Sequence, residues 1–397
     1  MNRYYKSYED FFGREAALEL EKLYGIFGAD TLEWAARLFD PEIGGFYYSN
    51  SARDTDGYLP DVESTTQLVG VISGADFEKY GNANNAFPEE MKAGIVRFVQ
   101  GLQDSEDGYF YHPQWGKEVN TSRSGRDLDS SLGLLRRFGG KPLYETPIER
   151  GKKGDNASLP EHLRSWEALL AWLEALGIND HHKSYANGHA VSSIRTQIAA
   201  AGYAEKTIEW LNSKQKESGL WEDGELDYPK FNGLLKISTL YETYGAPFPR
   251  LSLGVQACID TVFSDAPTGA IVDIYNPWVA LGILLPNAKA HSTPEEYEDA
   301  LEKVRANASK LFRRTREKLL EFRKDDGSFS YFKDRSSATS QGVPAAVPNT
   351  NEGDGNATAL AIATVGHIFK TCGIRMEYMF SAEDAKAFLD IIKGYYK

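Results

Sequence analysis

The sequence KAGIVRFVQGLQDSEDGYF, residues 92–110, sets the pattern on which the fold prediction rests. Its apolar residues recur at helical spacing, as Ile95, Phe98, Val99 and Leu102, and this spacing predicts an amphipathic helix. A polar stretch follows the helix and ends in Gly-x-aromatic. The pattern predicts an outer helix, a tight turn at the glycine, and an aromatic ring that fills the gap between helical hairpins.

The same motif, an amphipathic helix and a polar stretch ending in Gly-x-aromatic, recurs along the chain. Each time a helix that is apolar nearly all round follows it. The four endings of the motif are Gly44-Gly45-Phe46, Gly108-Tyr109-Phe110, Gly219-Leu220-Trp221 and Gly327-Ser328-Phe329. One such unit cannot bury its own apolar face, so repeated units must stack. We therefore predict an all-α fold, with residues 1–397 forming a single (α/α)6 toroid of helical hairpins around buried inner helices. An (α/α)7 toroid is the alternative.

Helical spacing predicts two alternating sets of helices. The outer helices are expected near residues 30–39, 87–103, 161–177, 203–215, 252–264 and 296–323. The inner helices are expected near residues 62–74, 127–138, 188–201, 231–244, 277–285 and 353–370. The terminal segments 1–28 and 381–397 are expected to add helices that brace the ring.

A glutamine precedes two of the Gly-x-aromatic turns. Gln103 lies before Gly108, and Gln215 lies before Gly219; a side-chain amide here can bond free carbonyl groups at the helix end. This order resembles the QW repeat of the terpene cyclase and protein prenyltransferase superfamily, whose members are α/α toroids. The resemblance implies architecture rather than chemistry, because toroidal polysaccharide lyases and (α/α)6 glycoside hydrolases share that architecture.

Composition restricts the classes of partner. A formal net charge of -13 argues against binding to nucleic acid or to an anionic membrane surface. The N-terminal sequence has no apolar core of signal-peptide length, and no segment is long enough to span a membrane. Cys258 and Cys372, the two cysteines, each stand alone in an apolar segment. We therefore expect a cytoplasmic protein with reduced cysteines, no bound metal and no cofactor.

Polar side chains gather where the inner helices are expected to begin. If these helices run parallel, their N-termini open on one end of the ring, and the polar groups surround a single mouth. The catalytic candidates are His189, Tyr275, Asn187, Glu63, Asp127 and Glu352. The substrate-binding candidates are Arg53, Arg126, Arg335, Asn232, Lys236, Asn276, Trp278, Tyr109, Trp115, Tyr228 and Asp354. An ordinary helix N-cap is the alternative role for Asp61, Asn187, Asn232 and Asn351.

The chemistry of these groups favours a carbohydrate ligand. Aromatic rings stack on sugar rings. Arg53, Arg126 and Arg335 each stand among hydroxyl residues and suit a carboxylated ligand, although an aspartate beside each of them is an equally good partner. His189 is the preferred base, because histidine can accept a proton near neutral pH, and His112 is its rival. A buried histidine bonded to a neighbouring carbonyl is the alternative role for His189.

Four functions remain open. By resemblance to toroidal lyases, Asn187 with Arg126 or Arg335 would hold a uronate carboxylate, His189 would remove the adjacent proton, and Tyr275 would protonate the leaving oxygen. A glycoside hydrolase would instead pair two carboxylates across the glycosidic oxygen. The candidates for that pair are Asp61 or Glu63 on one side and Asp127, Asp129, Glu352 or Asp354 on the other.

A class II terpene cyclase is the third function, and a sugar-binding toroid without activity is the fourth. The cyclases use Asp-x-Asp-Asp, whereas residues 127–130 read Asp-Leu-Asp-Ser. The Asp-Cys-His zinc set of the prenyltransferases has no counterpart here. The sequence therefore favours a carbohydrate-active enzyme, and a lyase slightly over a hydrolase.

Overall fold

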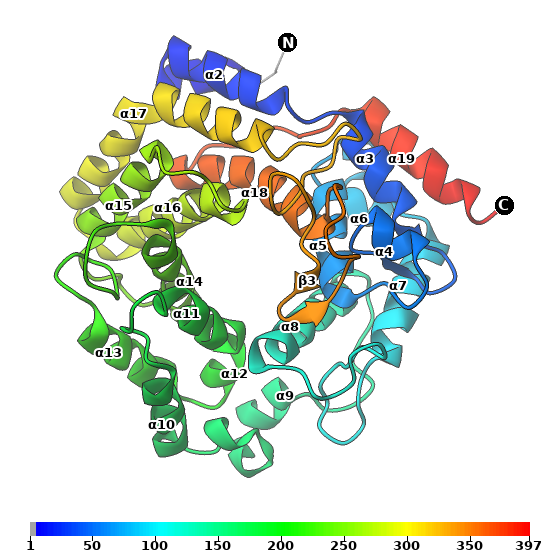
Figure 1. The fold of residues 1–397 in the computed structure, drawn as a ribbon, viewed down its shortest axis with the longest axis horizontal. Coiled ribbons are helices and arrows are strands. Elements are labelled where there is room, and N and C mark those ends of the chain that lie inside the picture. Colours follow the sequence, from blue (N-terminus) through cyan, green and yellow to red (C-terminus); the bar gives the residue numbers. More distant parts are fainter. Residues whose placement is uncertain (1–4) are drawn as a thin grey trace.

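The centre of the molecule is a ring of helices. The computed structural model describes residues 5–397, in which the named strands form only two short hairpins, so the prediction of a helical protein is confirmed at that level. Each central helix contacts the next one along the chain, and the last contacts the first (Figure 1). In chain order these helices are α5 (Val62–Ile72), α8 (Thr121–Arg137), α11 (Ser184–Ser193), α14 (Tyr228–Tyr244), α16 (Val272–His291) and α18 (Gly355–Cys372).

A second set of helices lies outside the ring (Figure 1). These are α3 (Ala29–Arg37), α7 (Glu89–Gly101), α10 (Trp166–Leu176), α13 (Ala204–Lys214), α15 (Leu251–Phe263) and α17 (Pro294–Leu320). At the chain ends, α1 (Tyr5–Phe12) and α2 (Arg14–Tyr24) pack on α17, and α19 (Ala382–Gly394) packs on α3. Both ends therefore cover outer helices. Residues 1–4 of the expected N-terminal brace lie outside the described residues.

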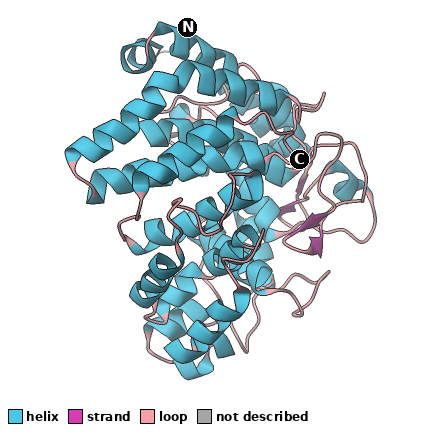
Figure 2. Cartoon of the chain, turned by 60° about the vertical axis from the view of Figure 1, so that its left-hand side comes forward, coloured by secondary structure: helices cyan, strands magenta, loops and turns pink. Residues whose placement is uncertain are grey.

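Short elements connect the long helices. The helical ones are α4 (Asn50–Asp54), η1 (Glu78–Tyr80), α6 (Ala83–Ala86), α9 (Pro147–Lys152), η2 (Asn156–Ser158), η3 (Glu161–Leu163) and α12 (Arg195–Ala200). The antiparallel hairpins pair β1 (Phe39–Asp40) with β2 (Gly45–Phe46), and β3 (Thr339–Ser340) with β4 (Val343–Pro344). Figure 2 shows the strands together at one side of the helical body. No helix within residues 5–397 combines the length and the apolar character needed to cross a membrane.

Three inner helices differ from the predicted spans. Helix α8 starts at Thr121 rather than 127, because the Asn120 side chain caps it by accepting a bond from Arg123 N. The span expected at 188–201 is two helices, α11 and α12, with Ile194 between them. Helix α16 continues through both of its prolines, and its burial on nearly every side compensates for the lost backbone bonds.

The glycine and glutamine of the repeated motif hold neighbouring hairpins together. Gly108 has a φ of 76°, and a Cβ there would collide with the carbonyl oxygen of Glu145. The Gln103 amide donates to Gly108 O at 3.2 Å and to Tyr144 O at 2.9 Å. These bonds reach the glycine and the following connection, not the helix end as expected. The motif thus joins one hairpin to the next.

The second glutamine repeats this arrangement. The Gln215 amide donates to Gly219 O at 2.9 Å and to Pro249 O at 3.2 Å. The aromatic ring that follows, Trp221, is fully buried, and its indole nitrogen donates to Leu211 O. Equivalent glutamine bonds therefore join the turn to the following connection in two of the four repeats.

Candidate functional site

A cavity of about 600 Å³ lies inside the ring, and all six inner helices contribute to its wall. The segment 331–341, which ends in hairpin β3–β4, supplies the rest of the wall. Two charged side chains line it, Arg126 and Lys236, and no carboxylate side chain is among the described residues that line it. The other polar side chains in the wall are His189, Tyr185, Tyr275, Tyr331, Gln67, Asn276, Asn356, Gln341, Ser337, Thr339 and Ser340.

Arg126 is aimed at the cavity by Glu63. Its guanidinium pairs with Glu63 on the neighbouring helix α5, and about a third of the Arg126 side chain stays exposed. Glu63 is buried, which raises its pKa, but Arg126 and Arg123 outweigh this and hold the pKa at about 2. Glu63 is therefore ionised at neutral pH and serves as the anchor of Arg126.

Behind Arg126 lies a fully buried arginine, Arg123. It contacts Asp61 at 3.1 Å, Glu63 at 3.4 Å and Asp127 at 2.8 Å, and its guanidinium lies 4.3 Å from the Trp115 ring centre. With Arg126, three carboxylates thus face two guanidiniums. Burial raises the pKa of Asp127 to about 7, so Asp127 is the carboxyl that can hold a proton and balance the cluster.

Lys236 has no carboxylate partner among residues 5–397. Its ammonium lies 5.7 Å from the centre of the Tyr185 ring and faces the cavity. Burial, together with the charge of Arg126, lowers the pKa of Lys236 to about 7. An anionic ligand would strongly stabilise the charged form of this amine, because the ligand would supply the missing counter-charge.

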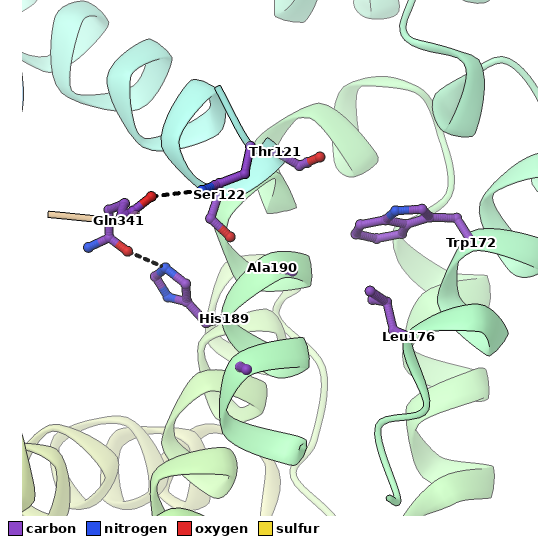
Figure 3. A pocket seen from close by; sticks show the side chains of 9 residues that line it. Thr121, Ser122, Trp172, Leu176, His189, Ala190 and Gln341 are labelled. Carbon is purple, nitrogen blue, oxygen red and sulfur yellow. Dashed lines mark hydrogen bonds between the residues drawn. The ribbon is translucent and has the colours of Figure 1, made fainter. Parts of the chain in front are cut away.

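His189 closes one side of the cavity. Its Nε2 lies 2.7 Å from the side-chain oxygen of Gln341, at the tip of hairpin β3–β4 (Figure 3). An amide oxygen only accepts, so Nε2 carries the hydrogen and Nδ1 keeps the lone pair. Burial and the charges of Lys236 and Arg126 lower the pKa of His189 to about 3. The imidazole is therefore neutral at physiological pH.

Tyr275 and Asn276 enter the cavity wall from one turn of α16. Burial raises the pKa of Tyr275 to about 12, so its hydroxyl is a proton donor at neutral pH. The Asn276 amide donates to Asn232 at 2.8 Å, and the Asn232 amide donates in turn to Asp273 at 3.0 Å. This chain of bonds fixes the orientation of Asn276 and gives Asn232 a supporting place behind the wall.

Five sequence candidates are engaged away from the cavity. Arg53 and Arg335 are paired with the adjacent Asp54 and Asp334. Asn187 lies within α11 rather than at its start and donates to Leu176 O. Glu352 accepts bonds from Ser51, and Asp354 caps α18. All five side chains are engaged by these partners, and none of them lines the cavity wall.

Four aromatic candidates also lie outside the cavity wall. Trp115 packs on Arg123, and its indole nitrogen donates to Pro344 O at 3.0 Å. Trp278 is buried and donates to Thr315 at 2.9 Å. The Tyr109 hydroxyl bonds Gln197 between hairpins. The Tyr228 hydroxyl accepts a bond from Lys318 of an outer helix. These rings pack within or between helical hairpins, as expected of aromatic residues at such junctions.

Residues of the cavity wall that sequence reasoning missed include Gln67 and Gln341. Gln67 follows Glu63 by one helical turn and bonds both Glu63 and Asn356. Gln341 and Gly342 form the two-residue turn of hairpin β3–β4, both with positive φ. The Gln-Gly pair between short strand-like runs is the signal that could have identified this turn.

No group of three or more His, Cys, Asp or Glu side chains within residues 5–397 is arranged to hold a metal ion. The wall instead offers two cations, a neutral imidazole, phenol hydroxyls and amides. Such a set can bind an anionic polar ligand and move a proton. No protein-family model and no curated protein matches the chain, so the geometry of the cavity carries the functional argument.

Proposed function

We propose that this protein is an (α/α)6 toroid whose mouth binds a uronate-containing oligosaccharide and cleaves it by β-elimination. One observation carries the proposal: the cavity inside the ring has two cationic side chains and no carboxylate in its wall. A carboxylated sugar supplies the counter-charge that Lys236 lacks and also meets Arg126, which keeps Glu63 as its anchor. The hydroxyl and amide groups around these two cations suit the other oxygens of the sugar. The closed order of the inner helices supports the six-hairpin architecture.

The elimination would use groups already present in the wall. Arg126 and Lys236 neutralise the substrate carboxylate, which makes the proton on the adjacent carbon more acidic. His189 Nδ1 takes this proton, the bond from the next carbon to the glycosidic oxygen breaks, and a carbon–carbon double bond forms. Tyr275 protonates the departing oxygen. The electrons of the broken C–H bond become the double bond, so the step consumes neither water nor an oxidant.

Substrate binding itself would activate the base. The pKa of His189 is low because of its burial and because of the charges of Lys236 and Arg126. A carboxylate bound between these cations cancels part of their field and raises the proton affinity of the imidazole. His189 would thus become a competent base only when the acidic sugar is in place.

The other functions have less support in the cavity. Asp61, Glu63 and Asp127 all contact Arg123 and lie behind the wall, where they cannot flank a glycosidic oxygen. Asp129 pairs with Arg195 at 3.4 Å and lies outside the cavity wall. We therefore infer elimination rather than hydrolysis or cyclisation. Both cysteines are unpaired and buried, which agrees with the proposed cytoplasmic location.

The test is ultraviolet absorbance during incubation with a panel of uronate-containing oligosaccharides, with reducing ends assayed in parallel. Elimination creates a conjugated double bond and a rising absorbance, and Arg126→Gln should lower kcat/KM about 10- to 100-fold. Arg53→Gln is the matched control, because Arg53 also pairs with a carboxylate but lies outside the cavity wall. Reducing ends without absorbance, or no product from any member of the panel, would overturn the proposal.

A further inference from the structure

A second, smaller pocket adjoins the central cavity. It has a volume of about 360 Å³ and lies between α8, α10 and α11. Ala186, His189 and Gln341 line both spaces. The wall that separates them is therefore made of these few side chains, and the His189–Gln341 bond spans it.

We propose that this side pocket is a second sugar subsite, which takes an uncharged sugar ring joined to the uronate held in the central cavity. The inference rests on the proposed function and specifies its substrate. An oligosaccharide occupying both spaces would place its glycosidic bond beside His189, since that imidazole belongs to both walls. The proposed base would then lie next to the bond that the elimination breaks.

The side pocket has the surfaces that a sugar ring requires. Figure 3 shows the Trp172 ring and Leu176 on one side of it and His189 with Gln341 on the other. The Trp172 ring is stacked on His162, with centres 5.0 Å apart, which fixes its orientation. A fixed indole provides a flat apolar face for the C–H side of a sugar.

Hydroxyl groups are available at the rim of the same pocket. Thr121 and Ser122, in the first turn of α8, line it, and their hydroxyls make no hydrogen bond within residues 5–397. They can therefore bond the ring hydroxyls of a bound sugar without losing an existing partner.

The two spaces differ in charge. The central cavity has Arg126 and Lys236 in its wall, whereas no Asp, Glu, Lys or Arg side chain is among the described residues of the side pocket. A carboxylate in the side pocket would lose its hydration without gaining a counter-charge. The pair of subsites therefore favours a uronate linked to a neutral sugar over a chain built of uronates alone.

The experiment compares Trp172→Ala with Trp166→Ala, a matched control on the same helix whose ring packs near Tyr203 instead. The substrates are an oligosaccharide that alternates uronate and neutral sugar, and an all-uronate oligosaccharide of equal length. Trp172→Ala should lower kcat/KM about tenfold for the alternating substrate and much less for the other. Equal losses on both substrates, or no difference from the control, would overturn the subsite.

A binding measurement separates this inference from the proposed reaction. Saturation-transfer NMR reports which sugar protons lie near the protein, whether or not catalysis occurs. Transfer to the neutral ring that is present in the wild type and lost in Trp172→Ala supports the subsite even if no double bond forms. Transfer that persists in Trp172→Ala overturns it, as does the absence of binding by either oligosaccharide.

Ser122→Ala is a second test of the subsite, which remains valid if Trp172→Ala disturbs folding. It removes only one hydroxyl at the rim of the pocket and should lower kcat/KM for the alternating substrate about three- to tenfold. Thermal unfolding followed by circular dichroism should give the wild-type midpoint. An unchanged kcat/KM would count against the subsite.

Discussion

His189 Nε2 and the side-chain oxygen of Gln341 lie 2.7 Å apart, although 152 positions separate the two residues in the chain. The contact joins α11 to hairpin β3–β4. Asn120 at the start of α8 donates to Gln341 O at 2.7 Å, and Ser340 donates to Glu63 of α5 at 3.2 Å. Three inner helices thus hold the hairpin over the cavity. Of the three residues that contact the hairpin from these helices, His189 is the one that lines the cavity.

The first prediction concerns the protonation of His189. Its pKa of about 3 means that the free protein should show no titration of this imidazole between about pH 5 and 8. A uronate oligosaccharide should raise that pKa by at least about one unit, since it neutralises Lys236 and Arg126. NMR of labelled histidine measures both states. An imidazole whose pKa does not move with ligand would contradict the activation argument.

The second prediction uses Lys236 and the pH dependence of stability. Its folded pKa of about 7 lies below the ordinary lysine value of 10.5. Below pH 7 the amine is charged in both folded and unfolded states, and the folded state bears the full cost of burying that charge. The cost declines as pH rises from about 7, where the native amine loses its proton, and disappears above 10.5, where the unfolded amine is neutral as well.

Lys236→Met should therefore increase the free energy of unfolding at pH 6, by about 1–3 kcal/mol. The gain should shrink steadily as pH rises from about 7 to 10.5. Urea denaturation at a series of pH values gives the comparison. A variant that is destabilised equally at every pH would show that Lys236 contributes packing rather than a buried charge. The same variant should bind uronates more weakly, because it lacks one of the two cations.

The helices that the sequence predicts best are those with apolar residues on every side. Helix α14 was expected at 231–244 and is found at Tyr228–Tyr244, and α18 was expected at 353–370 and is found at Gly355–Cys372. The start of α8 was missed because its first turns are polar. Arg123 is buried there because two carboxylates at the start of α5, far away in the chain, join Asp127 of its own helix around it. No local pattern contains that information.

The candidate site, like the helices, could be predicted only as far as local sequence determines it. Arg126, His189, Lys236, Tyr275 and Asn276 were identified because they lie near the starts of inner helices, and the ring brings those ends together. Arg53 and Arg335 share the same residue type and local sequence, yet each pairs with the aspartate beside it. Whether an arginine faces a cavity or a neighbour depends on the direction of the side chain, which sequence spacing does not specify.

The third prediction separates two carboxylates of the Arg123 cluster. Glu63 has a pKa of about 2 and is ionised at neutral pH, whereas the pKa of Asp127 is about 7. Glu63→Gln removes a buried charge that two arginines require and should cost about 3–5 kcal/mol of stability at pH 7. Asp127→Asn should cost less, because the native carboxyl already holds a proton part of the time.

The pH profiles of these two variants should also differ. Glu63 stabilises the folded state above about pH 4.5, and this contribution is lost as pH falls towards 2. Asp127 has the opposite sign: its raised pKa lowers stability as pH rises from 3.8 to about 7. Chemical denaturation at pH 4 and pH 8 measures both. Equal losses in the two variants at both pH values would rule out this division of charge.

The last prediction tests the role of the glycine in the Gly-x-aromatic motif. Gly108 and Gly116 have similar φ angles of 76° and 67°, but only Gly108 touches a neighbouring hairpin. A Cβ at Gly116 meets nothing within 4 Å, so Gly116→Ala should cost only the backbone strain of about 1 kcal/mol. Gly108→Ala adds a collision with the Glu145 carbonyl, and should cost about 3 kcal/mol or more. Because both variants share the strain, the difference between their urea midpoints isolates the close approach of the hairpins. If the two variants lose equal stability, the glycine serves only the turn, and the contact between hairpins does not explain its recurrence.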